Sequence, residues 1–353
     1  MEEKIYAMSQ DPIYIGTGGY CIGRVDNTIV KDPITKIPKI PGTSLGGTWR
    51  YYMALEIHSY FEDDFKTDRK SREGKKLDGE IFKVCSPEWV KDFDGNRYAA
   101  IKCAGQDDMP NDTWKSMETA AVDKKSGHCG HCIVCETFGF SKQDKSQRGM
   151  AYFSDLNILL FPVYTRFGTR WITSKSILTS VGIYIDDDLN LNDDEVFESK
   201  KGTKEGTINL GWLNFKSKAM SEGTKCKLKE LVNKNFSGST ILEENIIIAS
   251  DDIISQIINS NLETRTSVSI DPLTGAAKER ALFTSEAIPR GTVFYGDMRV
   301  EEHPLANGPA KEKVLGALKD SKKYFETLGI GGMTTRGFGR LKIFDWGDKD
   351  GSK

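Results

Sequence analysis

Three cysteines at two-residue spacing carry the clearest chemical signal in this sequence. The stretch GHCGHCIVCETFGF places them at Cys129, Cys132 and Cys135. Structural zinc takes four thiolate or imidazole ligands in a tetrahedron, so these sulfurs would supply three of them. The fourth ligand stays open, and we carry His128 forward from a set that also contains His131, Cys103 and Cys85. Three reduced surface thiols are the alternative interpretation.

An aspartate in an early glycine-rich loop is the second candidate for chemistry. Asp26 lies in GGYCIGRVDNTIVKDP, residues 18–33, directly after a predicted strand. Such an acid either caps a turn or does chemistry, and its type and position alone leave that choice open. Asp32, the neighbouring acid, precedes Pro33, and an Asp-Pro pair is typical of a turn.

A second glycine-rich loop, GIGGMTTRGFGR at residues 329–340, contains five glycines and two arginines. Glycine lets backbone N–H groups approach a phosphate closely, and the arginine fork matches phosphate oxygens. The phosphate-binding candidates in this loop are Gly331, Gly332, Thr335, Arg336 and Arg340. The alternative is a flexible turn between a helix and a strand. No Gly-Lys-Ser/Thr ends the loop, so it is not a Walker loop.

Residues 264–285, TRTSVSIDPLTGAAKERALFTS, predict a β-hairpin, because β-branched residues flank the turn DPLTG. Its apolar residues are Val268, Ile270, Leu282 and Phe283. A core hairpin is the interpretation that these residues favour when taken alone. The functional alternative is a projecting thumb whose apolar tip wedges between nucleic-acid bases.

Several regular elements must position these residues. Residues 43–61 predict a helix capped by Thr43 or Ser44, with apolar residues recurring at helical spacing at Leu45, Trp49, Met53, Ile57 and Phe61. We predict a strand at 4–15, an acidic polar loop at 186–206 and a last helix at 309–328. The order strand, helix, strands, helix, strand predicts an α+β fold with a ferredoxin-like core.

Composition sets the class of the protein. The 353 residues are 38% hydrophobic and 28% charged, no apolar run could span a bilayer, and MEEKIYAMSQ is not a signal peptide. We therefore expect a cytoplasmic protein with no membrane partner, in which clustered cysteines favour metal over disulfides. The net charge of −2 does not indicate nucleic-acid binding, but an acidic run at 183–198 and a basic run at 334–342 are compatible with a basic groove.

Together these motifs resemble one family. The opening DPIYIGTGGYCIGRVDNTIVKDPITKIPKIPGTSLGGTWR, the run CGHCIVCETFG, the hairpin and the late glycine loop occur in the order found in the RAMP-superfamily (Cas7-like) backbone subunit of type III CRISPR effector complexes. The similarity is strongest to the Cmr (III-B) kind. It implies one RAMP domain with an RRM-like, ferredoxin-related core. Its insertions would be a cysteine-rich one at 62–149, a polar acidic one at 183–243 and the thumb hairpin at 264–288.

The resemblance also implies a function. Copies of such a subunit stack along a CRISPR guide RNA, and their thumbs kink the guide–target duplex at regular intervals. A first-loop aspartate, here Asp26, cleaves single-stranded target RNA at each kink with Mg²⁺ or another divalent metal. A large polymerase-like subunit, a small subunit and capping RAMP subunits would complete the ribonucleoprotein. Zinc would be structural.

The same resemblance assigns further guide contacts to the helix start, at Ser44. The family often has Ser-Leu-Lys-Gly there, whereas this chain has Gly46 in place of the lysine, so Lys39 or Arg50 would compensate. The chemistry is plausible for a lone carboxylate, because RNA supplies its own 2′-OH nucleophile. A catalytically silent RNA-binding subunit and a guide-processing endonuclease that uses His58 as base are the alternatives.

Overall fold

The computed structural model describes residues 2–18, 25–60, 83–91, 132–141, 146–185, 191–199, 206–236, 242, 244–302 and 309–346. The chain packs as two compact units. The helical unit combines Met1–Glu3, Gly42–Ser154 and Asp297–Tyr324, and the sheet unit combines Lys4–Pro41, Asp155–Gly296 and Phe325–Lys353. We predicted one domain with three insertions; each unit draws on three stretches that lie far apart in the sequence. Among the described helices, none has the length and apolar character needed to cross a membrane.

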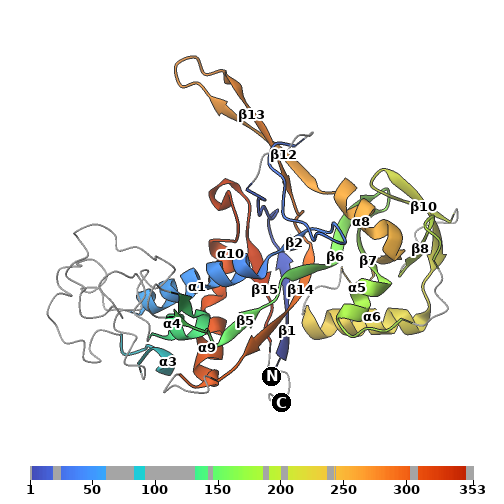
Figure 1. Ribbon diagram of the computed structural model, residues 1–353. Helices are drawn as coiled ribbons and strands as arrows, with labels where there is room; N and C mark the ends of the chain where they lie inside the picture. Colours follow the sequence, from blue (N-terminus) through green and yellow to red (C-terminus); the bar gives the residue numbers. More distant parts are fainter. Residues whose placement is uncertain are drawn as a thin grey trace. The chain divides into compact units, whose positions relative to one another are not determined.

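A large mixed sheet forms the frame of the sheet unit (Figure 1). Its strands in spatial order are β15 (Leu341–Ile343), β1 (Glu2–Ser9), β14 (Val293–Val300), β6 (Leu156–Thr165), β7 (Gly168–Ser174), β11 (Ile246–Ala249), β8 (Glu195–Glu198), β10 (Leu213–Ala219) and β9 (Thr207–Leu210). The pairs β7–β11 and β8–β10 are parallel. This confirms the prediction of a mixed α and β fold.

Strand β6 is the centre of the sheet unit. It pairs with β14 on one side and β7 on the other, and the short β2 (Lys39–Ile40) also pairs with its first residues. Leu159, Leu160 and Phe161 are consecutive and all completely buried. Alternate side chains of a strand point to opposite faces, so this run is covered on both faces, which explains its lack of polar alternation.

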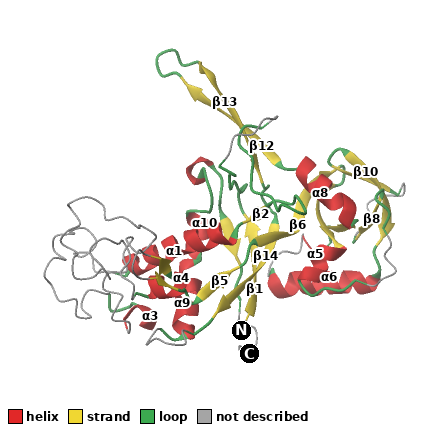
Figure 2. Ribbon diagram, in the orientation of Figure 1, coloured by secondary structure: helices red, strands yellow, loops and turns green. Residues whose placement is uncertain are grey.

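The stretch predicted as an acidic polar loop, 186–206, contains the buried strand β8, so the prediction is wrong at Glu195–Glu198. Val196 and Phe197 pack inward, and Lys218 on β10 pairs with Glu195 at 2.6 Å. A charged partner on the next strand lets a glutamate occupy a mostly buried position. Helices α5 (Lys175–Ser180), α6 (Glu222–Asn235) and α8 (Asp251–Ser260) lie beside these strands (Figure 2).

Helix α1 (Gly42–Ser59) organises the helical unit. It packs against α9 (Lys311–Ser321), α4 (Ile133–Phe138) and β5 (Ala151–Phe153), and β5 pairs with the last residues of β14. The remaining short elements are α3 (Glu88–Lys91), α10 (Lys323–Thr327), β3 (Phe140–Ser141) and β4 (Ser146–Gln147). The predicted last helix at 309–328 is thus two helices with a break at Lys322.

The predicted apolar face of α1 is confirmed, because Leu45, Trp49, Met53 and Ile57 are all fully buried. The predicted caps are wrong: the helix begins at Gly42, which puts Thr43 and Ser44 inside its first turn. Phe61 lies outside the described residues. Glu56 is also fully buried on this helix, where Lys323 donates to its Oε1 at 2.9 Å and Tyr60 donates at 2.8 Å. These bonds compensate the burial of a charge.

The turn before β2 is held by Asp32. Its Oδ1 accepts the backbone N–H groups of Ile34 and Thr35, each at 3.0 Å, and Lys39 Nζ lies 3.2 Å from Oδ2 and 2.7 Å from Asp155. The prediction that Asp32 sets a turn is confirmed. These donors, the Thr35 N–H first among them, lower the pKa of Asp32 to about 2.

We therefore predict that Asp32→Asn lowers the stability of the protein at pH 7 by about 1 kcal/mol, since asparagine keeps the turn acceptor but loses the charge. A carboxyl group whose pKa is lowered by folding stabilises the protein above about pH 4, and this contribution disappears as the pH falls toward 2. The difference in the free energy of unfolding between wild type and variant should therefore decrease toward zero over that pH range. Urea unfolding at a series of pH values measures it.

Asp155→Asn is the matched control, because it removes the other partner of Lys39 and leaves the backbone donors on Asp32 in place. It should still lose stability between pH 4 and 2, because the Asp32 carboxylate and its backbone donors remain. A stability difference for Asp32→Asn that stays constant down to pH 2.5 would contradict the assignment.

Candidate nucleic-acid interface

A two-stranded arm, made of β12 (Glu263–Ile270) and β13 (Ala277–Ala287), projects from the sheet unit (Figure 1). Its turn is closed by Asp271, whose backbone N–H donates to the Ala276 carbonyl at 2.8 Å, and whose Oδ1 accepts the Leu273 N–H at 2.8 Å. The hairpin is where the sequence predicts it. A core position, which its residues favoured when taken alone, is wrong.

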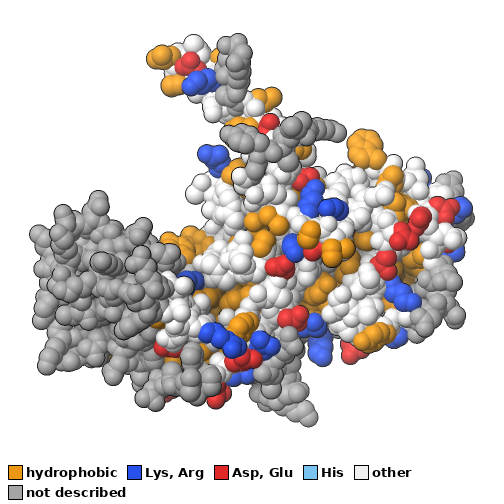
Figure 3. All heavy atoms as spheres, viewed as in Figure 1, with side chains coloured by type: hydrophobic (Ala, Val, Ile, Leu, Met, Phe, Trp, Pro, Cys, Tyr) orange, Lys and Arg blue, Asp and Glu red, His pale blue; other side chains and the backbone are white. Residues whose placement is uncertain are grey.

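Exposed apolar side chains line one face of this arm. Val268 and Leu282 are cross-strand partners and are 44% and 67% exposed, and Ile270, on the same face of β12, is 65% exposed. Leu273 in the turn is 94% exposed and was not among the predicted residues. Hydrophobic side chains are visible at the end of the arm in Figure 3. Water-exposed leucines and isoleucines in such a row mark a surface that contacts something else.

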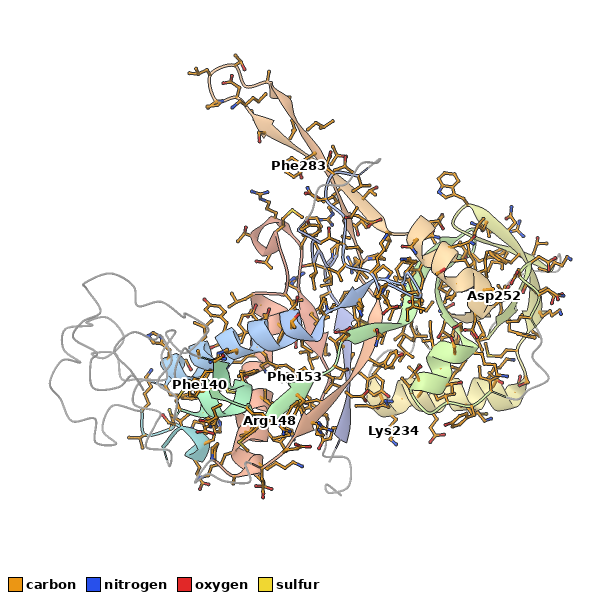
Figure 4. The ribbon with its side chains drawn as sticks, viewed as in Figure 1. Phe140, Arg148, Phe153, Lys234, Asp252 and Phe283 are labelled. Carbon is orange, nitrogen blue, oxygen red and sulfur yellow. The ribbon has the colours of Figure 1, made fainter. Side chains whose placement is uncertain are left out.

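Phe283 differs from the other predicted residues of the arm. It pairs with Ser267 and so lies on the opposite face from Leu282, and it is half-buried. Figure 4 shows it near the base of the arm.

The base of the arm holds Asp26. The Thr284 backbone N–H donates to Asp26 Oδ2 at 2.7 Å, and the Thr284 carbonyl accepts the N–H groups of Asp26 and Asn27, each at 3.1 Å. Asn27 continues the pairing, because its carbonyl accepts the Glu286 N–H at 2.9 Å. One carboxylate oxygen of Asp26 is thus anchored to β13, while its side chain as a whole is exposed.

The late glycine loop packs beside the same base. Gly331 has a φ of +83°, and a Cβ there would lie 2.2 Å from the Tyr14 carbonyl oxygen, so only glycine fits. Gly332 N–H donates to that carbonyl at 2.9 Å. Arg265 of β12 donates to the Gly337 carbonyl at 3.3 Å and stacks over Phe338 at 4.7 Å. The loop is therefore fixed both to the segment after β1 and to the arm.

The two predicted arginines of this loop have different environments. Arg340 forms a two-pronged ion pair with Asp11, at 2.6 and 2.9 Å, and this pairing lowers the pKa of Asp11 and raises that of Arg340. Arg336 ends a single 3₁₀ turn with Thr335 and is exposed, and its side chain pairs with no acid in the described part of the chain. Arg265 and Arg290 add further positive charge near Asp11.

We call this cluster the hairpin-base site. Its members are Asp26, Asn27, Arg265, Thr284 and Arg336. It joins three segments that the sequence singled out separately, namely the first loop, the hairpin and the late glycine loop. Arg265 is ion-paired with Glu263 at 2.6 Å, and the exposed Arg336 directly precedes Gly337, whose carbonyl Arg265 contacts. An exposed arginine and an exposed apolar arm on the same framework suit a nucleic acid, whose phosphates need cations and whose bases need apolar contact.

Three other predicted guide contacts, Lys39, Ser44 and Arg50, belong to β2 and α1. The Lys39 ammonium is held between Asp32 and Asp155, so a phosphate would have to displace a carboxylate. Arg50 and Ser44 belong to α1 in the helical unit, and Arg50 donates to the Gly139 carbonyl at 2.6 Å. His58 lies in the last turn of the same helix.

The cysteine cluster is described in part. Cys132 and Cys135 are fully buried at the start of α4, and the Cys135 N–H donates to Cys132 Sγ at 3.5 Å. The two-residue spacing of this pair is the one that zinc-binding cysteine pairs commonly have. Cys129 and His128 lie outside the described residues. Within the residues that are described, no three metal-binding side chains cluster.

Sequence analysis missed Asn27, Arg265 and Thr284 in the site and Leu273 in the turn of the arm. Leu273 could have been suspected, because a leucine in the turn DPLTG has no core to enter. The other three act through backbone hydrogen bonds and long-range packing, which no local pattern reports.

Comparison with known proteins identifies the fold. The family model for the RAMP superfamily matches residues 10–342. A type III-B Cmr-beta complex bound to cognate target RNA superposes with a TM-score of 0.56 at 12% identity, covering 98% of this chain and 97% of that one. Crystal structures of Cmr4 and of oligomeric Cmr4 from Pyrococcus furiosus give TM-scores of 0.53 and 0.52 at 17% and 16% identity, each covering 97% of this chain and 98% of the other.

Comparison with curated protein sequences gives no match. The structural likenesses share few residues with this chain and establish the fold, whereas the family model extends over nearly all of the sequence. The chain therefore belongs to the RAMP superfamily.

Proposed function

We propose that this protein is a guide-RNA-binding backbone subunit of a type III CRISPR ribonucleoprotein, of the Cmr kind, that cleaves guide-paired target RNA. The observation that carries the proposal is the bond from the Thr284 N–H to Asp26. It ties the only acid predicted to be catalytic to the base of the arm predicted to kink the duplex. Family membership and the likeness to Cmr structures, one of them bound to target RNA, support it.

The arm acts as a wedge in this proposal. The exposed apolar side chains of the arm, Val268, Ile270 and Leu282, contact the base faces that are freed when a stack is separated. Leu273, in the turn at the tip, enters the stack first. Separating two stacked bases costs a few kcal/mol, and apolar side chains offset this cost by covering the freed base faces. Because the arm and Asp26 are bonded at the base, the kink and the carboxylate keep a constant spacing.

The cleavage step needs little from the protein. The 2′-OH of the splayed nucleotide attacks the adjacent phosphorus, the bond to the 5′ oxygen breaks, and a 2′,3′-cyclic phosphate and a 5′-OH form. The Oδ1 of Asp26 accepts the 2′-OH proton while Oδ2 stays anchored to Thr284. The leaving oxygen takes a proton from water. Arg336 holds a neighbouring phosphate.

A divalent cation fits this site only together with RNA, since Asp26 is a single carboxylate and the described residues hold no cluster of three ligands. Mg²⁺ is commonly bound by one or two carboxylates plus substrate phosphates, and it would stabilise charge on the phosphate. The further copies, the polymerase-like subunit, the small subunit and the capping RAMP subunits remain partners that we propose from family membership. They would bury the exposed arm in the assembled particle.

The catalytic assignment predicts that Asp26→Asn lowers the cleavage rate of guide-paired target RNA by about 10²-fold or more. Asparagine keeps an oxygen acceptor for the Thr284 N–H, so assembly and target binding should stay close to wild type. Cleavage of labelled target by the guide-loaded complex measures the rate. A target with hydrogen in place of the 2′-OH at the cleavage position should bind and remain intact.

Asp32→Asn is the matched control, because it removes a carboxylate from the same loop that only holds a turn. It should cleave at close to the wild-type rate. Normal cleavage by Asp26→Asn would show that Asp26 only caps the loop, and the binding-only alternative would then be preferred. Guide maturation by the isolated chain would favour the processing endonuclease.

The glycine loop predicts a difference between its two arginines. Arg336→Ala should weaken binding of single-stranded RNA and reduce the slope of log K against log salt by about 0.7, the value for one phosphate contact on a single strand. Arg340→Ala removes an arginine already paired with Asp11 and should leave the slope nearly unchanged. Titrations at four salt concentrations measure both. Equal slopes for wild type and Arg336→Ala would show that the loop is only a turn.

For the cysteines we propose one structural zinc held by Cys129, Cys132, Cys135 and His128. The two-residue spacing of the cysteines and the N–H bond to Cys132 Sγ support sulfur ligands. Cys132→Ser should release about one zinc per chain and lower the melting temperature. Cys226→Ser, at an exposed cysteine of α6, should change neither. Metal analysis of gently purified wild-type protein that finds no zinc would rule out the site.

A further inference from the structure

Two turns of the sheet unit present large aromatic side chains to solvent. Trp212, in the turn between β9 and β10, is 90% exposed, and Tyr164, at the end of β6, is 74% exposed. Tryptophan is highly buried on average, so an almost completely exposed indole in a folded protein needs a reason. The sequence analysis did not single out either residue.

The backbone brings the two turns together. The Gly211 N–H donates to the Tyr164 carbonyl at 3.2 Å, which joins the β9–β10 turn to the β6–β7 turn. Arg166 lies in the second turn, donates to the Thr207 carbonyl at 2.8 Å and stacks over Phe167 at 4.8 Å. The guanidinium is exposed and held in place. We call Tyr164, Arg166 and Trp212 the aromatic platform.

The platform adjoins the start of the arm. Gly211 has a φ of +61°, and a Cβ there would lie 2.2 Å from Asn261 Oδ1, so the turn packs tightly on Asn261. Asn261 is the C-terminal cap of α8 and stands two residues before β12. Asp26 lies against the other strand of the arm, β13. The base of the arm thus carries a carboxylate on one strand and an exposed tryptophan beside the other.

We infer that the aromatic platform stacks an unpaired nucleobase of the bound RNA, with Arg166 on its phosphate. The inference rests on the proposed function, because the arm would release such a base when it separates a stack. Every nucleobase has a π-face, so exposed aromatic side chains bind single strands with little sequence preference. The exposed Arg166, which is held in one of the same two turns, favours a nucleic acid over an apolar protein surface, since it supplies the anion contact that the phosphate requires.

The test uses the full chain and a 12-nucleotide single-stranded RNA that carries one 2-aminopurine, whose fluorescence is quenched by stacking. Trp212→Ala should weaken binding by about 5- to 150-fold, the range for losing one base–aromatic stack, without changing the salt slope. The bound RNA should also show less quenching of its 2-aminopurine fluorescence than it shows with the wild-type protein. Trp212→Phe keeps a stacking ring and should recover most of both.

Val84→Ala is the control, because Val84 is 92% exposed and belongs to the helical unit. It should bind RNA like wild type. Unfolding should be unaffected in all variants, since an exposed side chain contributes little to stability. Wild-type affinity and quenching in Trp212→Ala would overturn the inference, and a simultaneous loss of association between copies would assign the platform to a protein contact instead.

Failure of the proposed function gives a different pattern. If the chain does not cleave guide-paired RNA, Asp26→Asn and wild type behave alike, yet the Trp212→Ala effect on single-stranded RNA persists. If only the platform is wrong, cleavage still depends on Asp26 and the Trp212 variants bind normally.

Discussion

The pairing of Asp26 and Asn27 with Thr284 and Glu286 is the constraint on which the rest of the site depends. It joins residues 258 positions apart in the sequence, and it does so mainly through backbone groups. A flexible loop with one exposed acid would otherwise sample many positions. Anchoring one carboxylate oxygen to the base of the arm sets the second oxygen at a constant place relative to whatever the arm contacts, and catalysis by a single carboxylate requires such positioning.

The glycine loop shows how packing and binding divide the same residues. Gly331 and Gly332 are needed because the loop runs against the Tyr14 carbonyl, a purely structural demand. Arg340 is used to pair with Asp11, whereas Arg336, four residues earlier, is exposed. A motif that looks like one phosphate cradle therefore separates into a structural framework and one exposed arginine. The ion pair with Asp11 commits Arg340 to a structural contact, and the exposed Arg336 is left to contact a ligand.

The arm exposes apolar side chains of a kind that folded proteins usually bury. Leucine and isoleucine at its end lose the hydrophobic stabilisation of burial, and a two-stranded hairpin alone is marginal in water. Its first-loop partner and Arg265 stabilise only the base. This arrangement is reasonable for a part of the protein whose apolar surface is covered after binding. The exposure of Trp212, beside the base of the arm, has the same explanation.

Local patterns in the sequence determined much of this protein. The four-residue spacing of Leu45, Trp49, Met53 and Ile57 specified a helix face, the turn DPLTG specified a hairpin, and the order of the motifs indicated the family. These features depend on neighbours within a few residues, so periodicity and turn chemistry report them. Only the tertiary structure decided that the hairpin projects, that β8 is buried within an acidic stretch, and that Asp26 meets Thr284. The physical reason is that exposure, ion pairing and backbone bonds between distant segments arise from how the elements pack, and no short stretch of sequence encodes them.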